Sequence, residues 1–99
     1  MILGILQARA GSSRLPGKVL KPLLGAPMLA RQIERLQRST RLDQLVVATS
    51  DQADDLAIAA LCAELDVPCF RGPLDDVLQR FHLAAQPFDP SQIVRLTGD

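Results

Sequence analysis

The chain opens with Met1–Leu6, MILGIL, and runs directly into Gln7–Lys18, QARAGSSRLPGK. The first six residues form a short apolar run, which is typical of a buried parallel strand. The next twelve contain two glycines, two serines, a proline and three cations, with no acid among them. Such a composition disfavours regular structure, so the sequence predicts a loop at the carboxyl end of the first strand.

This loop has the composition of an anion site, and phosphate is the anion that fits best. Gly11 and Gly17 allow consecutive backbone N–H groups to converge on one anion. The side chains that add hydroxyl or charge-assisted donors are Arg9, Ser12, Ser13, Arg14 and Lys18. The alternative is a solvated surface loop that is basic by accident. We favour phosphate because cations and glycines rarely coincide at a strand end.

The spacing excludes two common phosphate loops. A Walker loop has four residues between its glycines and a Ser or Thr after its lysine. Here Gly11 and Gly17 enclose five residues, and Val19 follows Lys18. The dinucleotide fingerprint Gly-x-Gly-x-x-Gly does not occur in the sequence either.

The stretch Leu6–Leu20, LQARAGSSRLPGKVL, resembles the signature loop of sugar-activating nucleotidyltransferases. It is most similar to the cytidylyltransferases that make CMP-activated acidic sugars, the CMP-Kdo synthetase relatives, and within them to the spore coat polysaccharide biosynthesis branch. The similarity extends over essentially all 99 residues. Residues 1–99 are therefore expected to be the N-terminal nucleotide-binding part of a nucleotidyltransferase domain, ending before the acceptor half.

The resemblance implies particular ligands and roles. CTP, a small acidic sugar and Mg²⁺ are the expected ligands, and a homodimer is compatible with the longer protein. The residues implied in CTP binding are Ala8, Arg9, Ser12, Ser13, Arg14, Lys18, Arg71, Asp76 and Thr97. Arg9 and Lys18 are the implied catalytic residues, and Asp99 the metal ligand.

Some of these residues also have plainer interpretations. A carboxylate after a glycine at a strand end suits magnesium, but Gly98-Asp99 is also an ordinary turn. Arg71, which the resemblance places beside the pyrimidine ring, is otherwise a surface arginine flanking a helix. Asp76 lies in the region of the base pocket in the family, but an acid at a helix N-terminus needs no such explanation.

Charge and composition narrow the class of protein. An apolar content of 47% excludes a disordered chain. The balance of 11 basic and 11 acidic residues gives no general attraction to nucleic acid or membrane. The charges are unevenly placed: residues 1–41 hold eight cations and one acid, Glu34, which suits a polyanionic ligand at one end. Cys62 and Cys69 lack metal or redox spacing and are expected to be free, largely buried thiols.

The expected location is the cytoplasm. Met1 leads straight into the first strand without the basic segment of a signal peptide. No apolar run approaches the ~18 residues of a membrane span. His82 has no Cys or His partner at metal spacing, so we interpret it as structural or exposed.

Strands and helices alternate along the rest of the chain. Strands are expected at 1–6, 45–49, 67–70 and 92–96. Helices are expected at 28–38, 51–65 and 74–85. Alternation of this kind predicts a parallel sheet in a Rossmann-like three-layer α/β/α nucleotidyltransferase fold, with right-handed crossovers and strand order 3-2-1-4. Ligands then bind at the switch point between the first and fourth strands.

Local patterns give more specific predictions for the helices. Pro27 is expected in the first turn of the first helix. Ser50 and Asp51 are expected to cap the second helix, with Asp54 and Asp55 in its first turn. That helix offers two apolar faces: Leu56, Ala60 and Ala63, or Ile58, Leu61 and Leu65. The third helix is expected to turn Val77, Leu78 and Phe81 inward.

Two further backbone predictions come from single residues. Asp66 ends the second helix in the left-handed region, where the family usually has glycine. Pro68 makes the third strand an edge strand.

The function that fits these features is transfer of CMP from CTP to an acidic or modified sugar, with release of pyrophosphate, in surface polysaccharide biosynthesis. A guanylyl- or uridylyl-transferring relative is one alternative. A non-catalytic nucleotide-binding module is another, and it applies if the chain ends at Asp99. By itself the 99-residue chain is expected to be inactive.

Overall fold

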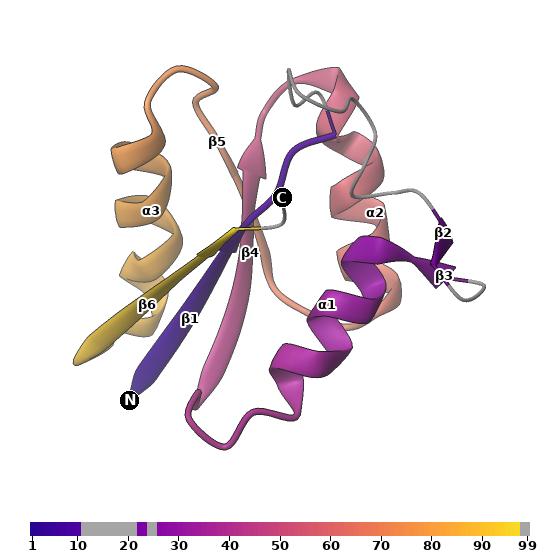
Figure 1. The fold of residues 1–99 in the computed structure, drawn as a ribbon. Coiled ribbons are helices and arrows are strands. Elements are labelled where there is room, and N and C mark those ends of the chain that lie inside the picture. The colour runs from indigo at the N-terminus through magenta and orange to yellow at the C-terminus, as the bar shows by residue number, and fades with distance from the viewer. Residues whose placement is uncertain (11–21, 24–25, 98–99) are drawn as a thin grey trace.

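The computed structural model of the chain describes residues 1–10, 22–23 and 26–97. Within these residues a four-stranded parallel sheet has the order β5-β4-β1-β6 (Figure 1). The strands are β1 (Ile2–Gln7), β4 (Gln44–Ser50), β5 (Cys69–Gly72) and β6 (Gln92–Thr97). In chain order this is 3-2-1-4, as predicted, so the switch point lies between β1 and β6.

In the described part of the chain, three α-helices cover the two faces of the sheet. They are α1 (Met28–Gln37), α2 (Leu56–Glu64) and α3 (Val77–Ala85). Helices α1 and α2 lie on one face and α3 lies on the other (Figure 1). The predicted three-layer α/β/α arrangement is therefore confirmed.

The core divides into two clusters because alternate side chains of a strand point to opposite faces. On the α1 and α2 side, Leu6 and Val47 of the strands pack with Ile33 and Ile58 of the helices. The cluster on the α3 side combines strand residues with small helical ones: Leu3, Ile5, Val46, Ala48, Ala84 and Ala85. Burial of β1 and β4 on both faces explains their continuous apolar sequences.

Short elements complete the described chain. Strands β2 (Pro22–Leu23) and β3 (Ala26–Pro27) pair antiparallel in a separate sheet. The 3₁₀ helices are η2 (Ala53–Asp55) and η3 (Gln86–Phe88). Pro27 closes β3 one residue before α1 begins, so its predicted place in the first helical turn is wrong by one position.

The predicted N-terminal cap of the second helix is wrong. Ser50 is fully buried at the end of β4, and Asp51 is exposed. Helix α2 starts only at Leu56, after η2. A run of acids and a serine after a strand resembles a cap in sequence, but Asp55 turns inward to bond to Arg9 and Ala10, which follow β1. Its side chain makes no capping hydrogen bond.

Of the two candidate faces of α2, the face containing Ile58 is the one that packs. Ile58 and Cys62 are fully buried, and Leu61 and Leu65 pack against the same cluster. Leu56 is 56% exposed. The helix ends at Asp66, whose φ of 56° confirms the predicted left-handed residue.

The predicted inner face of α3 is confirmed for Phe81, which packs against the core, and is wrong for Val77 and Leu78. Val77 and Leu78 are 38% and 73% exposed, whereas Arg80, Ala84 and Ala85 are buried. The helix begins at Val77 rather than at residue 74, because Asp76 caps it by accepting the N–H of Gln79 at 2.9 Å. Ala84 and Ala85 pack against the strands, half-buried Phe81 packs against the same cluster, and Val77 and Leu78 lie outside it.

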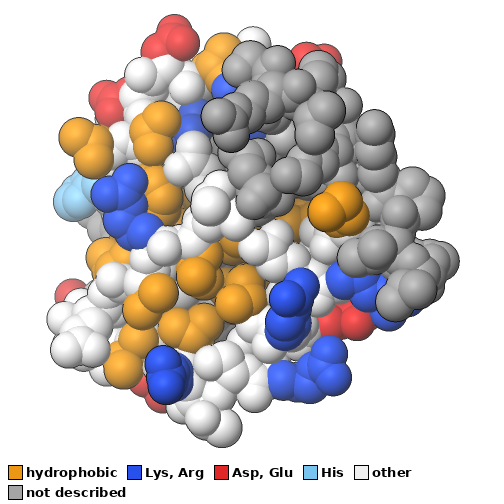
Figure 2. Space-filling model, viewed as in Figure 1, with side chains coloured by type: hydrophobic (Ala, Val, Ile, Leu, Met, Phe, Trp, Pro, Cys, Tyr) orange, Lys and Arg blue, Asp and Glu red, His pale blue; other side chains and the backbone are white. Residues whose placement is uncertain are grey.

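The edges of the sheet are β5 and β6. Strand β5 starts two residues later than predicted, and its edge position confirms the inference from Pro68. On the face in Figure 2, hydrophobic side chains gather over β6, where Ile93 and Val94 are 47% and 40% exposed. Within the described ranges, no helix has both the length and the apolar character needed to cross a membrane.

Candidate functional site

Because the strands are parallel, their carboxyl ends all lie at the same end of the sheet. Pairing between β1 and β6 continues to Gln7 and Thr97, and the N–H of buried Ala8 donates to the carbonyl of Ala48 at 3.1 Å. Gln32 of α1 donates from Nε2 to the carbonyl of Thr97 at 2.9 Å. Ala8, Arg9 and Thr97, three of the residues proposed from the sequence, are therefore brought together at the switch point.

Asp55 joins the end of β1 to the end of β4. Its Oδ1 accepts the backbone N–H of Ala10 at 2.7 Å. Its Oδ2 accepts the Nε–H of Arg9 at 3.5 Å and the hydroxyl of Ser50. The carboxylate is fully buried, and the Arg9 side chain is 31% exposed. Arg9 is thus held by an ion pair while part of its side chain remains exposed.

The environment of Asp55 favours the ionised form. Burial alone raises the pKa of this carboxyl. Hydrogen bonds from Ser50 and from the backbone of Ala10, together with the charge of Arg9, outweigh burial and leave the pKa below its usual value of 3.8. Asp55 is therefore a carboxylate at neutral pH, and it can act as a fixed negative partner for Arg9.

Arg71 fastens the β4–α2 connection to β5. Its Nε donates to the carbonyl of Ser50 at 3.1 Å, and its Nη2 donates to the carbonyl of Gln52 at 2.7 Å. The N–H of Asp51 in turn donates to the carbonyl of Gly72 at 2.9 Å. Arg71 is half-buried, so its position combines a structural role with partial access to solvent.

Arg80 of α3 lies close to Gly72 at the end of β5. The sequence alone does not indicate that this arginine is in the core. It is 1% exposed, and its Nη1 donates to the carbonyls of Pro73 and Leu74 at 3.0 and 2.8 Å. A Cβ added at Gly72 would lie 2.9 Å from Cγ of Arg80, so glycine leaves the space that this side chain occupies. Burial and the nearby Arg9 both lower the pKa of the Arg80 guanidinium, while Asp55 raises it.

Several predicted site residues are not part of this arrangement. Asp76 acts as the cap of α3, which supports the plainer interpretation of that acid. His82 is exposed, as expected. The remaining predicted residues lie outside the described part of the chain: Ser12, Ser13, Arg14, Lys18 and Asp99. In the described ranges, no group of three or more His, Cys, Asp or Glu residues could hold a metal ion.

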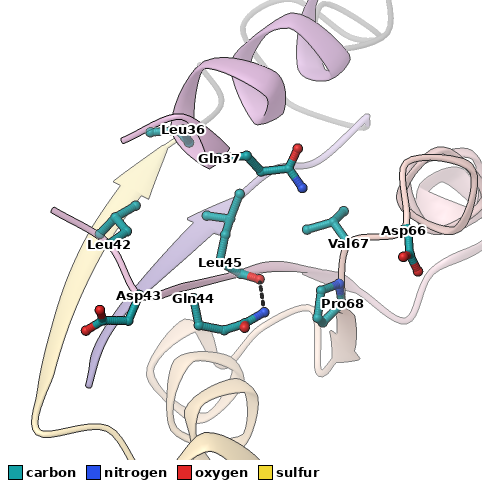
Figure 3. Close-up of a pocket in the computed structure, with 9 residues that line it drawn as sticks. All are labelled: Leu36, Gln37, Leu42, Asp43, Gln44, Leu45, Asp66, Val67 and Pro68. Atoms are coloured by element: carbon teal, nitrogen blue, oxygen red, sulfur yellow. Dashed lines mark hydrogen bonds between the residues drawn. The ribbon is translucent and has the colours of Figure 1, made fainter. Parts of the chain in front are cut away.

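A separate cavity of about 200 Å³ opens at the opposite end of the sheet, near the amino ends of β4 and β5 (Figure 3). It lies between the end of α1, the start of β4 and the turn that precedes β5. In it Gln44 donates from Nε2 to the carbonyl of Leu45 at 3.2 Å. Because it lies at the amino end of β4, this cavity is distinct from the switch point.

The model of the cytidylyltransferase family matches residues 3–99. The chain belongs to that family. The chain is 44% identical to the spore coat polysaccharide biosynthesis protein SpsF of Bacillus subtilis, over 99% of its own length and 42% of that protein.

Two solved structures have the same fold. A cytidylyltransferase of Leptospira borgpetersenii matches with a TM-score of 0.93 and 37% identity, over 99% of this chain and 41% of the other. A CMP:2-keto-3-deoxy-manno-octonic acid synthetase complexed with CTP matches with a TM-score of 0.77 and 27% identity, over 99% and 40%. The chain thus spans about two fifths of the length of these relatives.

Sequence reasoning missed the side chains that organise the described site. Ser50 and Asp55 were interpreted as local helix signals, although Asp55 bonds to Ala10, 45 positions away. The available signal was a serine followed five residues later by an aspartate, in the stretch that leads from the end of a strand to a helix. Arg80 gave a weaker signal: it lies on the same face of α3 as buried Ala84, four residues later.

Proposed function

We propose that this chain is the CTP-binding part of an enzyme that transfers CMP from CTP to an acidic or modified sugar and releases pyrophosphate. The observation that carries the proposal is Arg9, which an ion pair with buried Asp55 holds at the carboxyl end of β1 beside the switch point. The family, and the likeness to a synthetase whose structure contains CTP, support it.

In the proposed reaction a sugar hydroxyl attacks the α-phosphorus of CTP. A new P–O bond forms, the bond from the α-phosphorus to the bridging oxygen breaks, pyrophosphate leaves and the hydroxyl loses its proton. Such chemistry depends on alignment and on stabilising negative charge. We assign that charge stabilisation to Arg9 and Lys18.

The other roles are assigned on the family resemblance. Ala8, Ser12, Ser13 and Arg14 would contact the phosphates. Arg71 and Asp76 would lie on the side of the base, and Thr97 at the end of β6. Because Arg71 and Asp76 already bond to backbone groups, we expect them to shape the pocket through the turns that they hold.

Magnesium is the proposed cofactor, with Asp99 as its protein ligand. A carboxylate together with phosphate oxygens is a donor set that Mg²⁺ accepts. The ion would neutralise phosphate charge when bound. Asp99 lies outside the described residues. The cytoplasm is the proposed compartment, consistent with Cys62 and Cys69 being free thiols. A homodimer of the longer protein stays a prediction.

The test is a thermal-shift panel of this chain with CTP, UTP, GTP and ATP, each with Mg²⁺. A ligand at a hundred times its dissociation constant stabilises the folded state by about 2.7 kcal/mol, so a selective site is readily seen. We expect the largest shift with CTP, and an unchanged pattern for Arg41→Ala, which removes an exposed cation away from the site.

Equal shifts with all four nucleotides would mean that only phosphate is recognised, and the cytidylyl assignment would fail. A larger shift with UTP or GTP would favour a different nucleotidyltransferase. We expect no sustained pyrophosphate release from this chain with CTP and acidic sugars, since alignment of the attacking hydroxyl contributes about 7–11 kcal/mol to such reactions.

A further inference from the structure

We propose that Asp55 is a positioning residue of the CTP site, which holds Arg9 and the backbone of Ala10 in the geometry that binds the nucleotide phosphates. The inference rests on the proposed function and adds a residue to it. Asp55 is the only buried carboxylate among the residues that the structure describes. Its partners include Arg9 and Ala10, two consecutive residues of the predicted phosphate loop.

The two oxygens of Asp55 hold consecutive residues of the chain. Oδ1 accepts the N–H of Ala10 at 2.7 Å, and Oδ2 accepts the Nε–H of Arg9 at 3.5 Å. One carboxylate therefore fixes both the direction of the backbone as it leaves β1 and the side chain that follows the strand. The guanidinium is bound through Nε, at its base, and the Arg9 side chain remains 31% exposed.

The carboxylate is itself held rigidly. The hydroxyl of Ser50 donates to Oδ2 and accepts the N–H of Gln52 at 3.2 Å. The N–H of Asp55 donates to the carbonyl of Gln52 at 3.0 Å. Arg71 reaches from β5 to that same carbonyl at 2.7 Å. A continuous chain of polar contacts thus runs from β5, across the end of β4, to Arg9, two residues after the end of β1.

The charge of Asp55 also matters, because two guanidinium groups lie near it. Arg9 lowers the pKa of buried Arg80, and Asp55 raises that pKa. The carboxylate therefore offsets repulsion between two cations at this edge of the sheet. Asparagine at position 55 would keep an acceptor for Ala10 but would leave Arg9 without its charged partner.

The experiment is a double-mutant cycle on this chain, with affinities for CTP and CMP measured by calorimetry. The variants are Asp55→Asn, Arg9→Ala and the pair. The control is Asp54→Asn, which makes the same chemical change at the exposed neighbour. We expect Asp55→Asn to weaken CTP binding about tenfold, the effect of one charge-assisted contact, and to weaken CMP binding less.

Because Asp55 acts through Arg9, adding Asp55→Asn to Arg9→Ala should cost little further affinity, and the two effects should not add. A purely structural residue would lower the melting temperature and leave CTP affinity unchanged, and that result would overturn the inference. Additive losses in the cycle would overturn it too.

The outcome for the wild-type chain separates the two proposals. If the wild type does not bind CTP, the proposed function fails and the role of Asp55 fails with it. If the wild type binds CTP and Asp55→Asn binds it equally well, only the inference fails. Should Asp55→Asn not fold, Ser50→Ala replaces it in the same cycle with Arg9→Ala. Ser50→Ala removes the hydrogen bond that Asp55 accepts from the Ser50 hydroxyl and keeps the negative charge of Asp55. Additivity there would again overturn the inference.

Discussion

Asp55 links the stability of the folded chain to pH. Its folded pKa lies below its usual value of 3.8, since its hydrogen bonds and Arg9 outweigh burial. A depressed carboxyl pKa contributes stability that is present above the unfolded value and is lost as pH falls through the folded value. The contribution should therefore be complete at neutral pH and disappear at acid pH below about 4.

We expect Asp55→Asn to lower the free energy of unfolding at pH 7 by about 1.5–3 kcal/mol, the range for hydrogen bonds to a charged group. The difference between wild type and variant should shrink as pH falls from 5 toward 2.5, as measured by urea unfolding. Asp54→Asn, at an exposed position, is the control and should stay close to wild type at every pH. A difference that stays constant down to pH 2.5 would contradict the assigned pKa direction.

At the scale of elements, the orientation of α3 is the feature that local periodicity misjudged. Leu78 is 73% exposed, while Leu29 of α1 is 1% exposed. Truncation of a side chain that is already in water removes little apolar burial, whereas truncation in a packed core loses transfer energy and leaves a cavity. The two leucines therefore form a matched pair.

We expect Leu78→Ala to change the free energy of unfolding by less than about 0.5 kcal/mol. Leu29→Ala should cost about 2–5 kcal/mol. Chemical denaturation of both variants under the same conditions measures the contrast. A large loss of unfolding free energy in Leu78→Ala would contradict the exposed position of Leu78 and would support the inward orientation predicted from the sequence.

At the scale of the whole molecule, β6 is the strand that we expect to associate with other chains. Within the described residues it pairs with β1 alone, and Ile93 and Val94 are exposed on it. An apolar edge strand offers unpaired N–H and C=O groups to any other chain. The relatives are more than twice as long as this chain, so the edge is a natural place to look for contacts that the 99 residues do not make.

We expect the isolated chain to self-associate as its concentration rises, and Ile93→Lys to suppress that association, because a charge on an edge strand opposes pairing. Sedimentation velocity over a concentration series measures the effect. Leu56→Lys is the matched control, since Leu56 is similarly exposed but lies on α2. Equal self-association of the two variants would rule out β6 as the interface.

The sequence alone determined the architecture and the place of the site. Apolar runs at 2–6 and 45–49, separated by amphipathic segments, are sufficient for a parallel sheet, because β1 and β4 are buried on both faces. Right-handed crossovers then fix the order and the switch point. Arg9 and Thr97 could be placed together because each lies at the end of a strand.

Only the tertiary structure decided which polar groups serve the site and which helix faces are inside. Two of the three partners of Asp55, Arg9 and Ala10, lie 46 and 45 positions away, just after β1. The partners of Arg71 lie 19 and 21 positions away. A local pattern cannot distinguish an acid that caps a helix from one that turns inward to a distant donor. For α3, both faces carry apolar residues, and the structure shows that the face with Ala84, Ala85 and half-buried Phe81 is the one that packs against the strands.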